Sequence, residues 1–182
     1  MLISTKLQTI FLHNPKCAGS SIADTLLRHP KWGFKRSWKL YRTCRKDQHS
    51  IIIPRPCLNY YVFTTCRNPY DRIVSAYSWL IEYKKWNVSF DQYIMENLTG
   101  QGWMRTQDQY TRQAQVVIRY EDMAAGLNQL PFDLGELPEI NKTSTRPHWS
   151  TYLESNRVLH KIHQLYGNDF ISLGYDKWQS TG

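Results

Sequence analysis

Residues 13–21 read His-Asn-Pro-Lys-Cys-Ala-Gly-Ser-Ser, and this run is the most informative feature of the chain. The apolar run Thr9 to Leu12 before it is typical of a buried strand. Residues 22–27 after it have the spacing of a helix. A strand, a Gly/Ser loop with one lysine and a helix together capture a phosphate, because backbone N–H groups and the helix dipole point at the anion.

Taken alone, this loop is a weak signal. The Walker A phosphate loop has its lysine directly after the last glycine, whereas here Lys16 comes before Gly19. The alternative is an ordinary strand-to-helix turn in which Lys16 is solvated.

A second segment, residues 66–77, reads Cys-Arg-Asn-Pro-Tyr-Asp-Arg-Ile-Val-Ser-Ala-Tyr. The β-branched and aromatic run before it predicts a buried strand. Asn68 is a good N-cap and Pro69 suits the first helical position, so we expect a long helix to follow. Arg67 then lies where the strand ends, and its planar guanidinium matches a phosphate. Ser75 lies about two turns along the helix.

Each of these residues also has a structural interpretation. Arg67 has the spacing to form an ion pair with Asp71. Ser75 is small enough to serve only in helix packing.

Together the two segments resemble the cofactor signatures of the PAPS-dependent sulfotransferases, of the carbohydrate type called sulfotransferase family 2. PAPS is 3′-phosphoadenosine 5′-phosphosulfate. Residues 10–22 resemble the loop for the 5′-phosphosulfate, and residues 66–77 resemble the segment for the 3′-phosphate. Weaker likenesses extend over residues 117–123, 140–143 and 162–175. One departure is Cys-Ala at 17–18, where the family usually has Thr-Gly or Thr-Ala.

The resemblance implies that PAPS is the sulfuryl donor and that the product is the bisphosphate PAP. A sulfuryl group carries less charge than a phosphoryl group, so we expect no metal to be required. Lys16 would neutralise charge on the bridging oxygen, and the following backbone amides with the Ser20 hydroxyl would hold the 5′ phosphate. A late basic loop closes over the 3′-phosphate in such enzymes, although here it is equally a solvated loop. The expected cofactor residues are Lys16, Cys17, Ala18, Gly19, Ser20, Ser21, Arg67, Ser75, Lys142 and Arg146.

A hydroxyl acceptor needs a general base, and histidine suits this role near neutral pH. We predict His49 as the catalytic base beside Lys16, because residues 46–50 resemble the family's strand entry between the cofactor motifs. The alternatives are an ordinary loop histidine at 49 and, more weakly, Glu121 or Asp122. His148 is a further residue that we expect near the substrate.

The net charge of +8 has one local origin. Eight lysines and arginines lie between residues 28 and 46 with no acidic residue among them, and the remaining basic residues balance the acidic ones. This segment suits an anionic, sugar-containing acceptor, for which we select Lys35, Arg36 and Trp38. The alternatives are a solvated face that attracts a charged cofactor and, less favoured, a nucleic-acid site.

Strands alternating with helices predict an α/β fold, a three-layer parallel sheet flanked by helices, in a single domain over 1–182. With the resemblance this becomes the P-loop-like sulfotransferase fold. No apolar run is long enough to span a membrane and no signal peptide precedes the loop, so we expect a cytoplasmic protein or, alternatively, a trimmed part of a longer chain. The expected strands are 8–13, 50–53, 60–66 and 114–120, and the expected helices are 19–29, 69–86, 90–98, 121–130 and 149–166.

We therefore predict transfer of a sulfuryl group from PAPS to an acceptor hydroxyl on a carbohydrate. Three alternatives stay open: a P-loop-type nucleotide kinase, a basic nucleic-acid-binding module using residues 28–46, and a protein that binds the cofactor without turnover. Neither the identity of the acceptor nor the oligomeric state follows from the sequence.

Overall fold

The computed structural model describes residues 1–41, 47–98, 103–140 and 146–179. The chain divides into two compact units, each made of two stretches. The first unit is Met1–Cys66 with Gln109–Asn141, and the second is Arg67–Asp108 with Lys142–Gly182. The expectation of a single domain over 1–182 stays a prediction.

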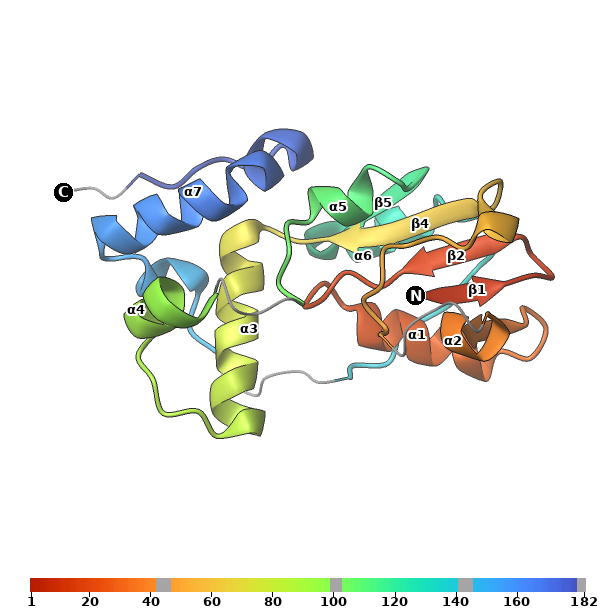
Figure 1. The fold of residues 1–182 in the computed structure, drawn as a ribbon, viewed down its shortest axis with the longest axis horizontal. Coiled ribbons are helices and arrows are strands. Elements are labelled where there is room, and N and C mark those ends of the chain that lie inside the picture. The colour runs from red at the N-terminus through yellow and green to blue at the C-terminus, as the bar shows by residue number, and fades with distance from the viewer. Residues whose placement is uncertain (42–46, 99–102, 141–145, 180–182) are drawn as a thin grey trace. The chain divides into compact units, whose positions relative to one another are not determined.

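The first unit contains a mixed sheet of five strands in the order β3-β1-β2-β4-β5 (Figure 1). Strands β2, β4 and β5 are parallel, and β1 runs antiparallel to both β2 and β3. The α/β prediction is confirmed, and the parallel arrangement holds for these three strands. The strands are β1 (Leu2–Ser4), β2 (Thr9–Leu12), β3 (Phe34–Arg36), β4 (Tyr61–Cys66) and β5 (Val116–Arg119).

The strand predictions missed two strands and included one that does not form. The short antiparallel strands β1 and β3 were not predicted, since three residues carry too little periodicity. Residues 50–53 form no strand although all four are described. Ile52 in this run is exposed, which a buried strand would not allow.

Alternate strand residues face two apolar clusters, as the period of a strand requires. One face carries Phe11, Phe63 and Ile118, which pack with α1 (Gly19–Arg28) and with Met123 and Leu127 of α6 (Met123–Leu127). The opposite face carries Ile10, Leu12 and Val62, all buried, with residues of the following elements. These elements are α2 (Ser37–Leu40), the 3-10 turn η1 (Arg55–Cys57) and α5 (Asp108–Thr111).

The register of the parallel strands places two chain segments at one edge of the sheet. Leu12 pairs with Thr64, so β2 and β4 end beside each other. The proposed phosphate loop leaves the end of β2, and Arg67 is bonded to Cys66, the last residue of β4. Ligands of such sheets bind at the carboxyl ends of the strands.

The second unit is helical. The apolar sides of α3 and α7 pack in one cluster with Tyr93 and Ile94. The expected helix over 69–86 is α3 (Pro69–Lys84), which Asn68 caps through the amides of Tyr70 and Asp71. The other elements are α4 (Phe90–Gln92), the π-helical turn η2 (Tyr93–Asn97), the 3-10 turn η5 (Trp149–Tyr152) and α7 (Asn156–Leu173).

The last helix differs from its predicted bounds of 149–166. It begins after Ser155, whose side chain accepts a hydrogen bond from the Val158 amide, and it ends at Gly174 with φ 64°. Gly167 lies inside it, directly after Tyr166, whose φ of −120° and ψ of 17° interrupt the helix. The glycine therefore marks a kink, not the end that was expected. Similarly, the helix expected over 121–130 is a 3-10 turn η4 (Tyr120–Asp122) followed by the short α6.

Candidate functional site

The loop between β2 and α1 has an uncommon backbone. Lys16 and Ala18 lie in the left-handed region, with φ 65° and 59°. Such values cost an L-amino acid roughly 1 kcal/mol or more, and they persist where a site requires them. Alternation with left-handed residues turns successive N–H groups toward one side and creates an anion-binding concavity.

The start of α1 supplies hydrogen-bond donors. The amides of Ser21 and Ile22 both donate to the Ala18 carbonyl, at 3.1 and 3.3 Å. In the described part of the chain, the amides of Gly19 and Ser20 have no protein acceptor. They are the donors that the start of a helix leaves for a ligand or for water.

Gly19 is required because His13 lies against it. A Cβ atom at residue 19 would overlap the imidazole ring of His13. That ring is only 5% exposed and stacks on Phe11 with centroids 5.9 Å apart. Burial lowers the pKa of His13 well below 6.5, and the neighbouring His49 acts in the same direction.

The side chain of Cys17 points into the protein. It is fully buried, and its Sγ donates to the Pro15 carbonyl at 3.4 Å. The departure from threonine at this position therefore concerns an inward-facing side chain. Lys16 beside it is half-buried.

His49 lies against this loop. Its ring meets that of His13 edge-on, with centroids 4.7 Å apart. Its Nδ1 lies 3.1 Å from the His13 carbonyl, and since a carbonyl only accepts, Nδ1 carries the proton. The neutral ring then has its basic lone pair on Nε2, which lies 3.2 Å from the side-chain amide of Gln48. The arrangement suits a base, although the catalytic role of His49 stays a prediction.

In the second unit, Arg67 forms an ion pair with Asp71, as the structural interpretation of this residue predicted. Its Nε and Nη2 both lie 2.6 Å from Oδ2 of Asp71. Arg146 also reaches this carboxylate, with Nη2 2.6 Å from Oδ1, and its Nη1 donates to the Asp71 carbonyl at 3.0 Å. Asp71 thus joins both arginines that were predicted to bind the 3′-phosphate. The third basic residue of that prediction, Lys142, lies outside the described residues.

Ser75 completes this cluster. It lies four residues after Asp71 on α3, so both side chains occupy one face of the helix. Ser75 is 8% exposed, and no partner for its hydroxyl lies in the described part of the chain. Two guanidinium groups, one carboxylate and a hydroxyl leave a net positive charge, which suits a phosphate.

Two residues that fix the backbone of Arg67 were not predicted. The side chain of buried Gln107 accepts from the Arg67 amide at 3.0 Å and donates to the Arg67 carbonyl at 2.7 Å. The carboxylate of Asp169 in turn accepts the Gln107 amide at 2.8 and 2.9 Å. Burial raises the pKa of Asp169 although this hydrogen bond opposes the change. In the sequence, only the family resemblance over residues 162–175 included Asp169.

Comparison with known families decides the class of the protein. The model of sulfotransferase family 2, described as a sulfotransferase family, matches residues 1–132. The chain belongs to this family. The reaction of a sulfotransferase is sulfuryl transfer, and the chain is accordingly a transferase. No curated protein and no solved structure matches the chain.

The match covers both proposed phosphate segments of this sulfotransferase, including Arg67, Asp71 and Ser75. It ends before Arg146 and before α7. Among the described residues no cluster of His, Cys, Asp and Glu has the geometry of a metal site. Within the same residues, no helix is long and apolar enough to cross a membrane.

The described part of the basic segment of the sulfotransferase runs from the last residue of α1 through β3 and α2. Lys35 is exposed, and the guanidinium of Arg36 lies 5.4 Å from the ring centroid of Trp38. These three residues are therefore near one another in the first unit. His148, the fourth residue expected near the substrate, belongs to the second unit, where it is exposed and accepts the Ser150 amide to cap η5. Arg42, Arg45 and Lys46 lie outside the described residues.

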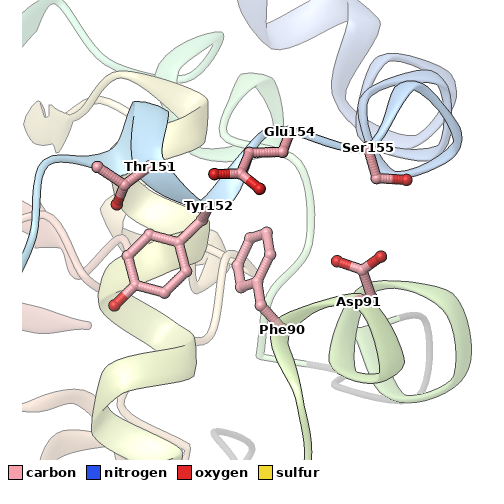
Figure 2. Close-up of a pocket in the computed structure, with 6 residues that line it drawn as sticks. All are labelled: Phe90, Asp91, Thr151, Tyr152, Glu154 and Ser155. Carbon is pink, nitrogen blue, oxygen red and sulfur yellow. The ribbon is translucent and has the colours of Figure 1, made fainter.

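A pocket of about 410 Å³ opens in the second unit. Figure 2 shows α4 forming one wall with Phe90 and Asp91, while residues 151–155 form the other. None of the predicted site residues lines this pocket, so it is separate from the cluster around Asp71. Its lining is Phe90, Asp91, Thr151, Tyr152, Glu154 and Ser155.

Proposed function

We propose that this sulfotransferase uses PAPS as its donor and transfers the sulfuryl group to a hydroxyl of a carbohydrate. The observation that supports PAPS as the donor is the loop before α1. There the Gly19 and Ser20 amides find no acceptor among the described residues, and they lie beside half-buried Lys16. PAPS supplies an activated sulfuryl group attached to a phosphate. The loop offers donors of the kind that such a charged group needs.

We assign the two ends of the nucleotide to separate segments. Residues 16–21 would hold the 5′-phosphosulfate through backbone amides, the Ser20 hydroxyl and the Lys16 ammonium. Arg67, Arg146 and Ser75 would hold the 3′-phosphate, with Lys142 as an additional cation. The cluster around Asp71 supports this assignment, because its net positive charge and its Ser75 hydroxyl suit a phosphate.

The residues of the loop have distinct chemical tasks in this proposal. Nε2 of His49 takes the proton of the acceptor hydroxyl as that oxygen forms its bond to sulfur. The hydrogen bond from Nδ1 to the His13 carbonyl orients the ring for this task. Lys16 neutralises the negative charge that develops on the bridging oxygen as the bond to the leaving phosphate breaks.

For the acceptor we propose an anionic, sugar-containing substrate that contacts Lys35, Arg36 and Trp38. An exposed lysine and a guanidinium over an indole ring support binding of carboxylate or sulfate groups together with stacking on a sugar. His148 remains a proposed substrate contact. Lys35→Ala with Trp38→Ala should raise the KM for such an acceptor and leave the affinity for PAP unchanged.

Calorimetric titration with PAP, and with ATP beside it, tests the donor. Without metal, PAP should bind tightly and ATP weakly, because only PAP carries a 3′-phosphate. Lys16→Ala and Arg67→Ala should each weaken PAP binding by roughly 1.5–3 kcal/mol through loss of charge-assisted hydrogen bonds. Tight binding of ATP that requires Mg²⁺, with no preference for PAP, would instead identify a kinase.

Turnover of a sugar acceptor tests the base. His49→Ala should abolish turnover while PAP affinity stays close to that of the wild type. A variant that retains full turnover would show that another residue takes the proton.

A further inference from the structure

The carboxylate of Asp71 is shared by two arginines that lie 79 positions apart in the sequence. Oδ2 accepts from Arg67 and Oδ1 accepts from Arg146. The three side chains are largely buried, with exposed fractions of 8% for Arg67, 18% for Asp71 and 17% for Arg146. All of these contacts lie within the second unit.

The physical problem at this place is repulsion between like charges. Two guanidinium groups that must face the same phosphate repel each other when no anion is bound, and solvent screens them little because they are largely buried. A carboxylate between them compensates one of the two charges. It also fixes both side chains through hydrogen bonds, since each oxygen accepts from a different arginine.

The backbone of Asp71 adds to this arrangement. Its carbonyl accepts a second hydrogen bond from Nη1 of Arg146, so that side chain is held at two points. Ser75 follows one turn later on the same face of α3. The same helix therefore carries the anchor for both arginines and the Ser75 hydroxyl, for which the described residues supply no partner.

We propose that Asp71 is a positioning residue, which holds Arg67 and Arg146 side by side for the 3′-phosphate without touching the ligand. This inference rests on the proposed function, since it concerns the recognition of the 3′-phosphate of PAP. In this role Asp71 contributes to the preference for a nucleotide that carries a 3′-phosphate over one that lacks it.

A rival role for Asp71 predicts an effect of opposite sign. If the carboxylate were only a counter-ion that competes with the phosphate, Asp71→Asn would raise the local positive charge and tighten PAP binding. If it positions the arginines, the same substitution weakens PAP binding despite the added charge. The direction of the change therefore separates the two roles.

The experiment is calorimetric titration of the full chain with PAP and with adenosine 5′-monophosphate, which lacks the 3′-phosphate. Asp71→Asn should weaken PAP binding roughly tenfold to a hundredfold and leave the affinity for the monophosphate unchanged. Asp71→Glu, which keeps the charge, should recover part of the loss. Asp24→Asn is the matched control, because Asp24 forms the same i,i+4 pair with Arg28 at an exposed place on α1.

Arg146→Ala provides a second test. If Asp71 acts through Arg146, Asp71→Asn should have a much smaller effect on PAP affinity in the Arg146→Ala background than alone. Full additivity would overturn the inference, as would unchanged or tighter PAP binding by Asp71→Asn, or an equal loss for both nucleotides. A wild-type chain that binds PAP no better than the monophosphate would overturn the proposed 3′-phosphate site itself.

Discussion

The backbone of Gly19 lies directly against the imidazole ring of His13 at the start of α1. The imidazole of His13 takes the volume in which any side chain at residue 19 would lie, and its neighbours Phe11 and His49 leave it little room to move. The glycine therefore serves a close approach, since its own φ is not in the left-handed region. The backbone amide that the loop presents depends on this contact.

Gly19→Ala should lower the free energy of unfolding by about 1–3 kcal/mol, because a methyl group is forced into a filled space. It should also weaken PAP binding, as the loop must shift to relieve the overlap. Urea unfolding and calorimetry measure the two effects. Gly167→Ala is the matched control. The new Cβ would lie 4.0 Å from Nζ of Lys177, so the substitution should be neutral or slightly stabilising in a helix.

The first turn of α3 sets the position of the arginine cluster. Asn68 accepts the amides of Tyr70 and Asp71 at 3.0 and 3.5 Å, and Pro69 begins the helix. The cap fixes the angle at which the chain turns from Arg67 into the helix, and therefore the place of Asp71 relative to Arg67. The side chain of Gln107 fixes the backbone of Arg67 from the other side.

Asn68→Ala should cost about 1 kcal/mol of stability, the usual effect of losing a helix cap. It should also weaken PAP binding, since the pair between Arg67 and Asp71 loses its fixed geometry. Asn68→Asp keeps the acceptor and should retain most of both properties. If Asn68→Ala binds PAP with wild-type affinity, the cap does not position this cluster.

Element by element, the sequence predicted what local patterns encode. The strands at 9–12 and 61–66 are apolar runs followed by turn signals, and α3 carries a cap, a first-turn proline and helical spacing, so each could be predicted. Strand β1 pairs with β2 on one side and with β3 on the other. Each of β1 and β3 depends on this pairing, which a segment of three residues does not indicate in the sequence. The start of α7 was misplaced for a related reason, since the 3-10 turn at 149–152 resembles a helix in sequence.

The same division applies to the candidate site. Arg67, Asp71 and Ser75 follow one another at helical spacing, so their common face was predictable. The contact between Asp71 and Arg146 joins residues 75 positions apart and was not foreseen. Gln107 and Asp169 likewise meet only through tertiary packing, and neither residue type signals a backbone support.

Two histidines give the whole molecule a dependence on pH. Burial lowers the pKa of His13, and burial followed by the charge of Lys177 lowers that of His163. In the unfolded chain both histidines bind a proton near pH 6.5, whereas in the folded chain they bind it only at a lower pH. The unfolded state thus holds more protons below this pH, and the free energy of unfolding falls as the pH is lowered from about 6.5.

His13→Gln should flatten this dependence, because the variant has no group to titrate at residue 13. The slope removed is at most about 1.4 kcal/mol per pH unit for one proton. Urea unfolding at several pH values between about 5 and 7 measures it, with His148→Gln as the control at an exposed site. An unchanged slope in His13→Gln would contradict the assignment of this effect to His13.

The two units interleave along the chain, and this limits how the protein can be shortened. The backbone passes from one unit to the other after Cys66, after Asp108 and after Asn141, so no single cut releases either unit intact. A clone that stops at residue 132, where the family match ends, would remove α7 and leave apolar residues such as Ile73 and Val74 without their partners Ile162 and Phe170. Such a fragment should aggregate when expressed, whereas an internal deletion that joins Cys66 to Gln109 through a linker, in a chain that stops at Asn141, is the route to an isolated sheet unit.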